Sequence, residues 1–308
     1  MFPVVPETSM DDVGSLEDVK QNLTHLLVDP IIYKQLHEKF NARRPTGVLM
    51  WGPPGCGKTL LAKAIANFAC LNLLPISGPQ LLNMYQGESE RAIRDTFQKA
   101  RTVAPCIIFF DEFDAICPVR SNRSESGSKA TVVNTLLAEM NGITQRGDVY
   151  VIAATNRPDT LDPAITRPGR FDTTLYVGLP DLKGRESILN AITKKGKIPK
   201  IAEDVKIEEI AQRCQDFSGA DLSWLVYTAS KEAIAEIKNH PDFKQNNINS
   251  VNEDYVVSLK NFNSALKRVQ PSISYKQRQH YEKLKKKLES SKKFIENVEE
   301  TEEQMITN

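Results

Sequence analysis

The sequence predicts an α/β fold in which helices sandwich a parallel β-sheet, followed by a smaller domain made only of helices. Up to about residue 180, short apolar segments alternate with segments of helical periodicity, which is typical of a parallel sheet. One short segment, 106–110, is almost wholly apolar, as expected of a strand buried on both faces. Beyond residue 180, helical patterns follow one another with no strand between them.

The elements are predicted in chain order from these patterns. Pro3 and Pro6 predict an extended N-terminal arm, and two helices are expected after it, at 15–27 and 30–40. Five strands are predicted, at 47–51, 72–77, 106–110, 149–154 and 174–177. Helices are expected between the strands over 60–68 and 88–101, and after them over 184–193, 206–213, 219–238 and 258–269.

These elements predict four parts of the chain. They are an arm or linker at 1–14, a large α/β domain at 15–179, a small helical domain at 180–271 and a charged helical tail at 272–308. We expect the tail to be a solvated helix that frays. The alternative for its basic segment 283–287 is a nuclear-targeting signal.

Composition excludes several classes of function. The 40 Lys and Arg residues nearly balance 39 Asp and Glu residues, so we expect no direct nucleic-acid partner. No apolar run approaches the roughly 18 residues of a membrane span, and residues 1–10 lack the layout of a signal peptide, which predicts an intracellular protein without a membrane partner. The five cysteines form no CxxC pair and the four histidines are scattered, so we expect reduced thiols and no protein-ligated zinc or iron.

Residues 52–59, GPPGCGKT, fit the pattern G-x-x-x-x-G-K-[ST] of a phosphate-binding loop, between a buried strand and a helix. The glycines let backbone N–H groups turn inward around an oxyanion, and the helix N-terminus adds partial positive charge. Lys58 is expected to reach the β- and γ-phosphates of a nucleotide, and the Thr59 hydroxyl to ligate Mg²⁺.

Two carboxylates follow a second buried strand. The apolar residues 107–110 lead into Asp111 and Glu112, which places both acids at the carboxyl end of a strand, where α/β sheets bind ligands. Asp111 is expected to hold Mg²⁺, and Glu112 to polarise the attacking water as a general base. The pair therefore predicts hydrolysis as well as binding.

Three more polar residues follow later strands. Asn156 is placed to hydrogen-bond the water and the γ-phosphate, with a turn-forming role before Pro158 as the alternative. Arg167 and Arg170 flank a tight turn and are predicted to stabilise transition-state charge as arginine fingers. The alternative for both arginines is a surface loop with salt bridges.

In this order and spacing, the motifs resemble those of the AAA family of ATPases, over about residues 8–290. The resemblance implies ATP and Mg²⁺ as cofactors, a helical lid, and a hexameric ring in which Arg167 and Arg170 reach the neighbouring subunit's site. Residues 12–14 and 218–221 resemble the segments that flank the adenine. The implied nucleotide-binding residues are Asp12, Val13, Gly14, Pro54, Gly55, Cys56, Gly57, Lys58, Thr59, Leu60, Asp111, Gly219 and Ala220, and the implied catalytic residues are Glu112, Lys58, Asn156, Arg167 and Arg170.

Residues 84–90 resemble the family's first pore loop, whose aromatic residue grips a translocating polypeptide. Substrate contacts are therefore expected at Met84, Tyr85, Gln86 and Gly87, and 120–129 stand at the place of the second pore loop. The sequence departs from the family pattern at four positions. They are Met10 for an aromatic residue, Ser15 for a glycine, Gln86 for an apolar residue and Asn141 for an aspartate.

A narrower resemblance is carried by 78–85, 114–121, 192–196 and 272–284. These segments resemble the second of two tandem modules in nucleolar AAA proteins that remove assembly factors from pre-60S ribosomal particles. Because this chain has one phosphate loop, we expect it to be one module of a longer protein, in the nucleus or nucleolus.

The leading hypothesis is a ring-forming ATPase that remodels or threads protein substrates. Two alternatives stay open. One is a nucleic-acid-stimulated motor of the same fold, which a basic pore would allow despite the near-neutral net charge. The other is a nucleotide-binding assembly module with little activity in isolation.

Overall fold

A computed structural model describes residues 3–40, 47–82, 88–119, 126–142, 148–167, 169–194, 196–238 and 256–288. The chain divides into two compact units, 1–272 and 273–308, and each is considered by itself. The predicted boundary between residues 179 and 180 falls inside the first unit and stays a prediction.

A five-stranded parallel sheet forms the centre of the first unit, as the sequence predicts. Its strands are β1 (Gly47–Trp51), β2 (Asn72–Ser77), β3 (Cys106–Asp111), β4 (Val149–Thr155) and β5 (Thr173–Tyr176). They lie in the order β2-β3-β4-β1-β5, and every pair is parallel. After β1 the chain crosses to the edge strand β2, returns through β3 and β4, and then places β5 on the other side of β1. This order puts a topological switch point between β1 and β4, where such sheets bind ligands.

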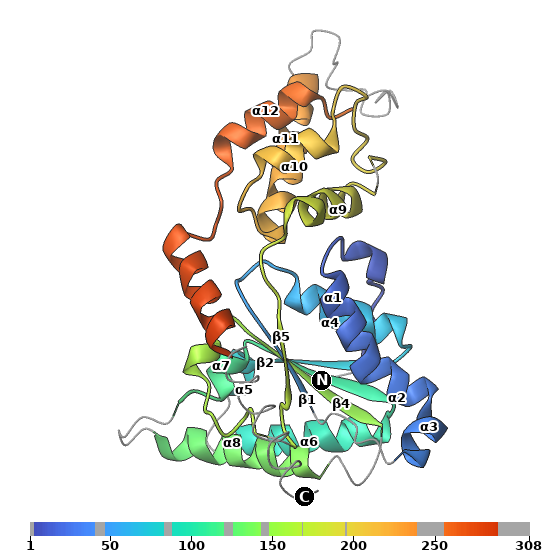
Figure 1. Ribbon diagram of the computed structural model, residues 1–308, viewed down its shortest axis with the longest axis vertical. Coiled ribbons are helices and arrows are strands. Elements are labelled where there is room, and N and C mark those ends of the chain that lie inside the picture. The colour runs from blue at the N-terminus through green and yellow to red at the C-terminus, as the bar shows by residue number, and fades with distance from the viewer. Residues whose placement is uncertain are drawn as a thin grey trace, which may run out of the picture. The chain divides into compact units, whose positions relative to one another are not determined.

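Helices cover both faces of the sheet (Figure 1). Helix α4 (Lys58–Phe68) lies on one face, and α6 (Glu88–Thr102) and α8 (Ser126–Asn141) lie on the other. The core against α6 and α8 contains Ile108 and Phe110 of β3. Because side chains alternate along a strand, Ile107 and Phe109 point to the opposite face, and both are also buried. This burial on two sides explains why 106–110 is almost wholly apolar.

The N-terminal segment contains more secondary structure than the sequence predicts. A 3₁₀ turn, η1 (Met10–Asp12), precedes a nearly continuous run of helical turns formed by α1 (Glu17–Leu23), the π-helical η2 (Thr24–Val28), α2 (Asp29–Ile32) and α3 (Lys34–Lys39). Before η1, Val4 pairs antiparallel with Leu73 through two N–H···O bonds of 3.0 Å. The predicted arm therefore adds backbone partners to the edge strand β2.

Four of the described elements between the strands were not predicted from the sequence. Three are short, namely α5 (Gly78–Leu82), α7 (Phe113–Ile116) and the 3₁₀ turn η4 (Pro158–Thr160), and the fourth is the longer helix α8. Helix α8 begins at Ser126, so 126–129 are helical, whereas 120–125 lie outside the described residues.

The segment after β5 is helical, as predicted, and packs around a core of its own. It contains α9 (Leu182–Ile192), α10 (Ile207–Arg213), α11 (Gly219–Lys238) and α12 (Leu259–Arg268). Leu189, Leu225 and Phe262 are buried at the centre of this second core. In the second unit, residues 275–288 are helical. None of the helices in the described ranges combines the length and the apolar character needed to cross a membrane.

Two phenylalanines in different surroundings test the core against α6. Phe97 is fully buried, with its ring 6.5 Å from that of Phe110, whereas Phe68 at the end of α4 is 56% exposed. We expect Phe97→Ala to destabilise the fold by about 3–5 kcal/mol through the cavity it leaves. Phe68→Ala is the matched control and should change stability by less than about 1 kcal/mol. Chemical denaturation followed by fluorescence measures both, and equal losses would contradict this assignment of the core.

Candidate functional site

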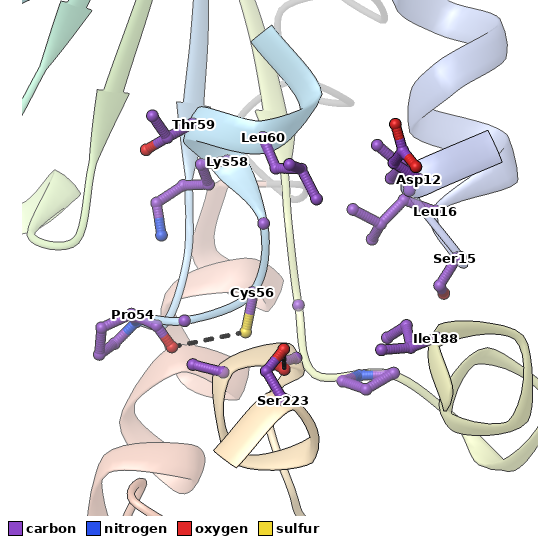
Figure 2. Close-up of a pocket in the computed structure, with 18 of the residues that line it drawn as sticks. Asp12, Ser15, Leu16, Pro54, Cys56, Lys58, Thr59, Leu60, Ile188 and Ser223 are labelled. Carbon is purple, nitrogen blue, oxygen red and sulfur yellow. Dashed lines mark hydrogen bonds between the residues drawn. The ribbon is translucent and has the colours of Figure 1, made fainter. Parts of the chain in front are cut away.

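A cavity of about 460 Å³ lies at the carboxyl end of the sheet, within the size range of ligand pockets. Figure 2 shows its lining from the N-terminal segment, the β1–α4 loop, and helices α9 and α11. Residues at the ends of β3 and β4 also line it. Glu112 and Asn156 line it together with all the residues predicted to bind nucleotide. The latter are Asp12, Val13, Gly14, Pro54, Gly55, Cys56, Gly57, Lys58, Thr59, Leu60, Asp111, Gly219 and Ala220.

The loop between β1 and α4 depends on glycine where the chain passes other backbone. A β-carbon at Gly52 would lie 2.0 Å from the Val177 carbonyl oxygen, just beyond β5. Gly57, with φ of 90°, turns the chain into α4, and the Gly57 carbonyl accepts the N–H of Leu61 at 2.8 Å. The first turn of α4 therefore begins at the cavity, where its partial positive charge suits an anion.

Lys58 is folded into this loop. Its Nζ donates to the carbonyl oxygens of Gly52 and Pro53, at 2.9 and 2.7 Å, and the residue is only 7% exposed. Burial lowers the pKa of the Lys58 ammonium to about 8. The site thus holds a cation whose present partners are neutral carbonyls, which an anionic phosphate can replace with a stronger, charge-assisted interaction.

One hydrogen bond joins the two predicted metal-binding residues. The Thr59 hydroxyl donates to Asp111 Oδ2 at 2.7 Å, and Asp111 Oδ1 accepts the backbone N–H of Glu112 at 2.9 Å. Glu112 itself adopts a left-handed backbone conformation, with φ of 52°, where β3 ends and α7 begins. An αL residue here turns the chain sharply, which leaves both carboxylates lining the cavity.

Asn156 directly follows Thr155, whose side chain makes a buried polar contact that was not predicted from the sequence. The Thr155 hydroxyl donates to Asp114 Oδ1 at 2.7 Å and accepts the N–H of Arg157 at 2.9 Å. Thr155 is the last residue of β4 and is fully buried. Its contacts hold the turn after β4 to the segment that follows β3, and so set the relative positions of Asn156 and Glu112. A threonine ending an otherwise apolar strand is the signal that predicts such a contact.

An apolar wall faces the phosphate loop across the cavity. Helix α9 passes so close to the N-terminal segment that a β-carbon at Gly14 would lie 2.5 Å from Ile188 Cα. Ser15, one of the departures from the family pattern, lies against Gly184, where an added β-carbon would be 2.6 Å from the Ser15 hydroxyl. The lining residues that were predicted neither to bind nucleotide nor to take part in catalysis are Ser15, Leu16, Gly178, Pro180, Ile188, Ile192 and Ser223.

Helix α11 closes the cavity beside the phosphate loop. The N–H of Ala220 donates to the Gly55 carbonyl at 3.0 Å, so the start of the helix contacts the loop directly. Cys56 is buried nearby, with its Sγ 3.8 Å from the Pro54 carbonyl. Burial raises the pKa of the Cys56 thiol to about 11, which keeps it protonated at neutral pH.

Among the residues that the structure describes, the predicted arginine fingers, Arg167 and Arg170, do not line this cavity. Arg167 is exposed, and Arg170 Nη1 donates to the Ala164 carbonyl at 2.5 Å. The pore-loop positions Met84, Tyr85, Gln86 and Gly87 lie outside the described residues.

Comparison with known protein families gives two matches. Residues 48–179 match the ATPase family associated with various cellular activities (AAA), and residues 204–249 match the AAA+ lid domain. This chain belongs to the AAA family of ATPases. The family resemblance of the sequence motifs is thereby confirmed, and membership in this ATPase family implies nucleotide binding.

Individual relatives agree with this AAA assignment. The chain is 47% identical to nuclear valosin-containing protein-like of Mus musculus over 93% of its own length and 33% of that protein. It is 44% identical to the ribosome biogenesis ATPase RIX7 of Saccharomyces cerevisiae, over 93% of this chain and 36% of RIX7. Protein SAV of Sulfolobus acidocaldarius is 42% identical, over 94% of this chain and 38% of SAV. The chain thus spans about a third of the length of these relatives. That it corresponds to a second ATPase module stays a prediction.

The pKa of Lys58 predicts how nucleotide affinity depends on pH. The charged form binds phosphate, and its fraction falls about tenfold between pH 7 and pH 9 for a group with a pKa of about 8. We therefore expect the Kd for a fluorescent ATP analogue to rise about tenfold over this range. Lys58→Arg keeps its charge and should bind with a Kd independent of pH, whatever its absolute affinity. A flat profile in the unmodified chain would contradict the assigned role of Lys58.

Proposed function

We propose that this AAA chain binds ATP with Mg²⁺ and hydrolyses it within a hexameric ring of such subunits, and that it uses this cycle to remodel or thread a protein substrate. The observation that supports this best is the placement of Lys58, Thr59, Asp111, Glu112 and Asn156 around one cavity. A site built only to bind phosphate does not need the carboxylate of Glu112 beside it.

The residues present fit a nucleotide with a magnesium ion. The Thr59 hydroxyl and the Asp111 carboxylate offer oxygen ligands 2.7 Å apart, and Mg²⁺ typically takes one or two protein oxygens together with phosphates and waters. When bound, the ion would neutralise charge on the β- and γ-phosphates. The apolar wall with Val13 and Ile188 suits the base, opposite the polar loop that suits the phosphates.

Each polar side chain then has a separate task. Lys58 exchanges the carbonyls of Gly52 and Pro53 for phosphate oxygens. Glu112 accepts a proton from the attacking water, and Asn156 orients that water against the γ-phosphate. Because Thr155 and Asp114 join the segments that carry these two residues, the distance between base and orienting amide is set by the fold.

A neighbouring subunit supplies what this cavity lacks. Arg167 and Arg170 lie outside their own subunit's cavity, so we propose that they act on the nucleotide of an adjacent copy. A guanidinium group there stabilises the charge that develops on the transferred phosphoryl group. In the ring, Met84, Tyr85, Gln86 and Gly87 are proposed to contact the translocating polypeptide.

The setting of this activity is proposed from the relatives. RIX7 is named a ribosome biogenesis ATPase, and a protein of Dictyostelium discoideum that is 45% identical over 94% of this chain is named a putative ribosome biogenesis ATPase. We propose that this chain acts in the nucleus or nucleolus, on assembly factors of pre-60S particles. The narrower resemblance of 78–85 and 114–121 supports the same setting.

Replacing the proposed general base separates binding from turnover. Glu112→Gln keeps the shape of the side chain but removes its basicity, so ATP affinity should stay within about twofold while hydrolysis falls at least about 10²-fold. Phosphate release and titration with a fluorescent ATP analogue measure the two quantities. Glu208→Gln, at an exposed position of α10, is the control and should hydrolyse ATP normally. Turnover near the control rate in Glu112→Gln would exclude Glu112 as the base.

The trans role of the arginines predicts a concentration dependence. Hydrolysis per subunit should rise with protein concentration at saturating Mg²⁺, because each site then gains a neighbour. Arg170→Ala should remove this rise and lower the plateau about 10³-fold or more. Arg91→Ala, which removes a well-exposed arginine of α6, is the control. Activity per subunit that is measurable and independent of concentration would contradict the proposed ring.

A further inference from the structure

The carboxylate of Asp221 connects two distant segments of the helical region. Asp221 lies in the first turn of α11 and is only 7% exposed. Its Oδ2 accepts the backbone N–H and the hydroxyl of Ser218, both at 2.9 Å. The same oxygen accepts the hydroxyl of Ser272 at 3.0 Å and the Ser272 N–H at 3.3 Å. One buried oxygen thus takes four donors, two of them from a residue that follows α12.

Capping of α11 accounts for only two of these four hydrogen bonds, those from Ser218. Ser218 and Asp221 form a reciprocal cap, since the Ser218 hydroxyl also accepts the N–H of Asp221 at 3.2 Å. Helix α12 has an equivalent cap, in which Asn261 Oδ1 accepts the N–H and hydroxyl of Ser258 at 2.9 and 2.8 Å. The α12 cap works with a neutral amide. In α11 a charged carboxylate takes its place, and charge-assisted hydrogen bonds are the stronger kind.

The start of α11 also contacts the phosphate loop. Ala220 donates its N–H to the Gly55 carbonyl at 3.0 Å. A β-carbon added to Gly55 would lie 2.9 Å from both Ala220 Cβ and the Ser218 hydroxyl oxygen, so the two backbones are closely packed. Gly219 and Ala220 line the cavity beside this contact. A shift of the first turn of α11 must therefore move one wall of the cavity away from the phosphate loop.

We propose that Ser272 is a positioning residue for nucleotide binding, which acts through Asp221 to hold the start of α11 against the phosphate loop. This inference rests on the proposed nucleotide function and adds a determinant of affinity outside the cavity. Ser272 does not line the cavity, and the residue as a whole is exposed. Losing its hydroxyl removes one donor from a buried carboxylate, which lowers the fraction of molecules in which α11 contacts Gly55. Apparent affinity falls in proportion to that fraction.

The test compares serines that make similar hydrogen bonds in different places. Titration of the full chain with mant-ATP and Mg²⁺ gives the Kd, and a thermal melt without nucleotide gives the stability. Ser272→Ala should weaken binding about three- to tenfold. Ser272→Thr keeps the hydroxyl and should bind within about twofold of the unmodified chain. In steady-state hydrolysis, Ser272→Ala should raise KM with kcat changed by less than about twofold, as expected of an effect on binding alone.

Ser258→Ala is the matched control. It removes a helix cap of the same design, on a helix that does not line the cavity, and should lower the melting temperature while leaving the Kd within about twofold. If Ser272→Ala binds mant-ATP like the unmodified chain, or if Ser258→Ala weakens binding equally, the positioning role is wrong while nucleotide binding stands. If the unmodified chain binds no mant-ATP, the proposed function fails with it.

Discussion

The hydrogen bond from Thr59 to Asp111 is the contact on which the site most depends. Strands β1 and β3 are not neighbours, because β4 lies between them, yet the first turn of α4 and the end of β3 meet at 2.7 Å. This contact is available only because all five strands run parallel and end at the same edge of the sheet. The loop that follows β1, the carboxylates that follow β3 and the amide that follows β4 then converge on one cavity. Each element supplies one type of group, and the strand order brings them together.

Much of the fold could be predicted because it is encoded in short, contiguous patterns. The apolar run at 106–110 and the helical spacing over 219–238 each carry their own signal, and both correspond to observed elements. Helix α8 was missed because its first turn is Ser126, Gly127 and Ser128, residues that favour loops over helix interiors. The strand order and the pairing of Val4 with Leu73 were not predictable in the same way. Both depend on contacts between segments far apart in sequence, which no local pattern specifies.

The candidate site likewise contains residues that a local sequence pattern predicts and residues that only the folded chain brings together. The phosphate loop and the acid pair are contiguous motifs of unusual composition, and the sequence therefore predicts them together with their chemistry. Leu16, Ile188 and Ile192 are ordinary apolar residues that become cavity walls only because α9 packs against the N-terminal segment. The position of Ser15 also depends on a residue distant in sequence. It departs from the family pattern, and the space for its hydroxyl exists because Gly184, some distance along the chain, has no side chain.

Burial of the Lys58 ammonium carries an energetic cost. Lowering the pKa of a lysine from 10.5 to about 8 corresponds to about 3 kcal/mol disfavouring the charged form in the folded chain. The group's folded-state pKa lies below its unfolded value, so this cost is present at neutral pH and disappears as the pH rises toward 10.5. A bound phosphate supplies the opposite charge that the carbonyls of Gly52 and Pro53 lack. Ligand binding and folding are therefore linked through one buried cation, and a nucleotide that binds only the folded chain stabilises it in proportion to its occupancy.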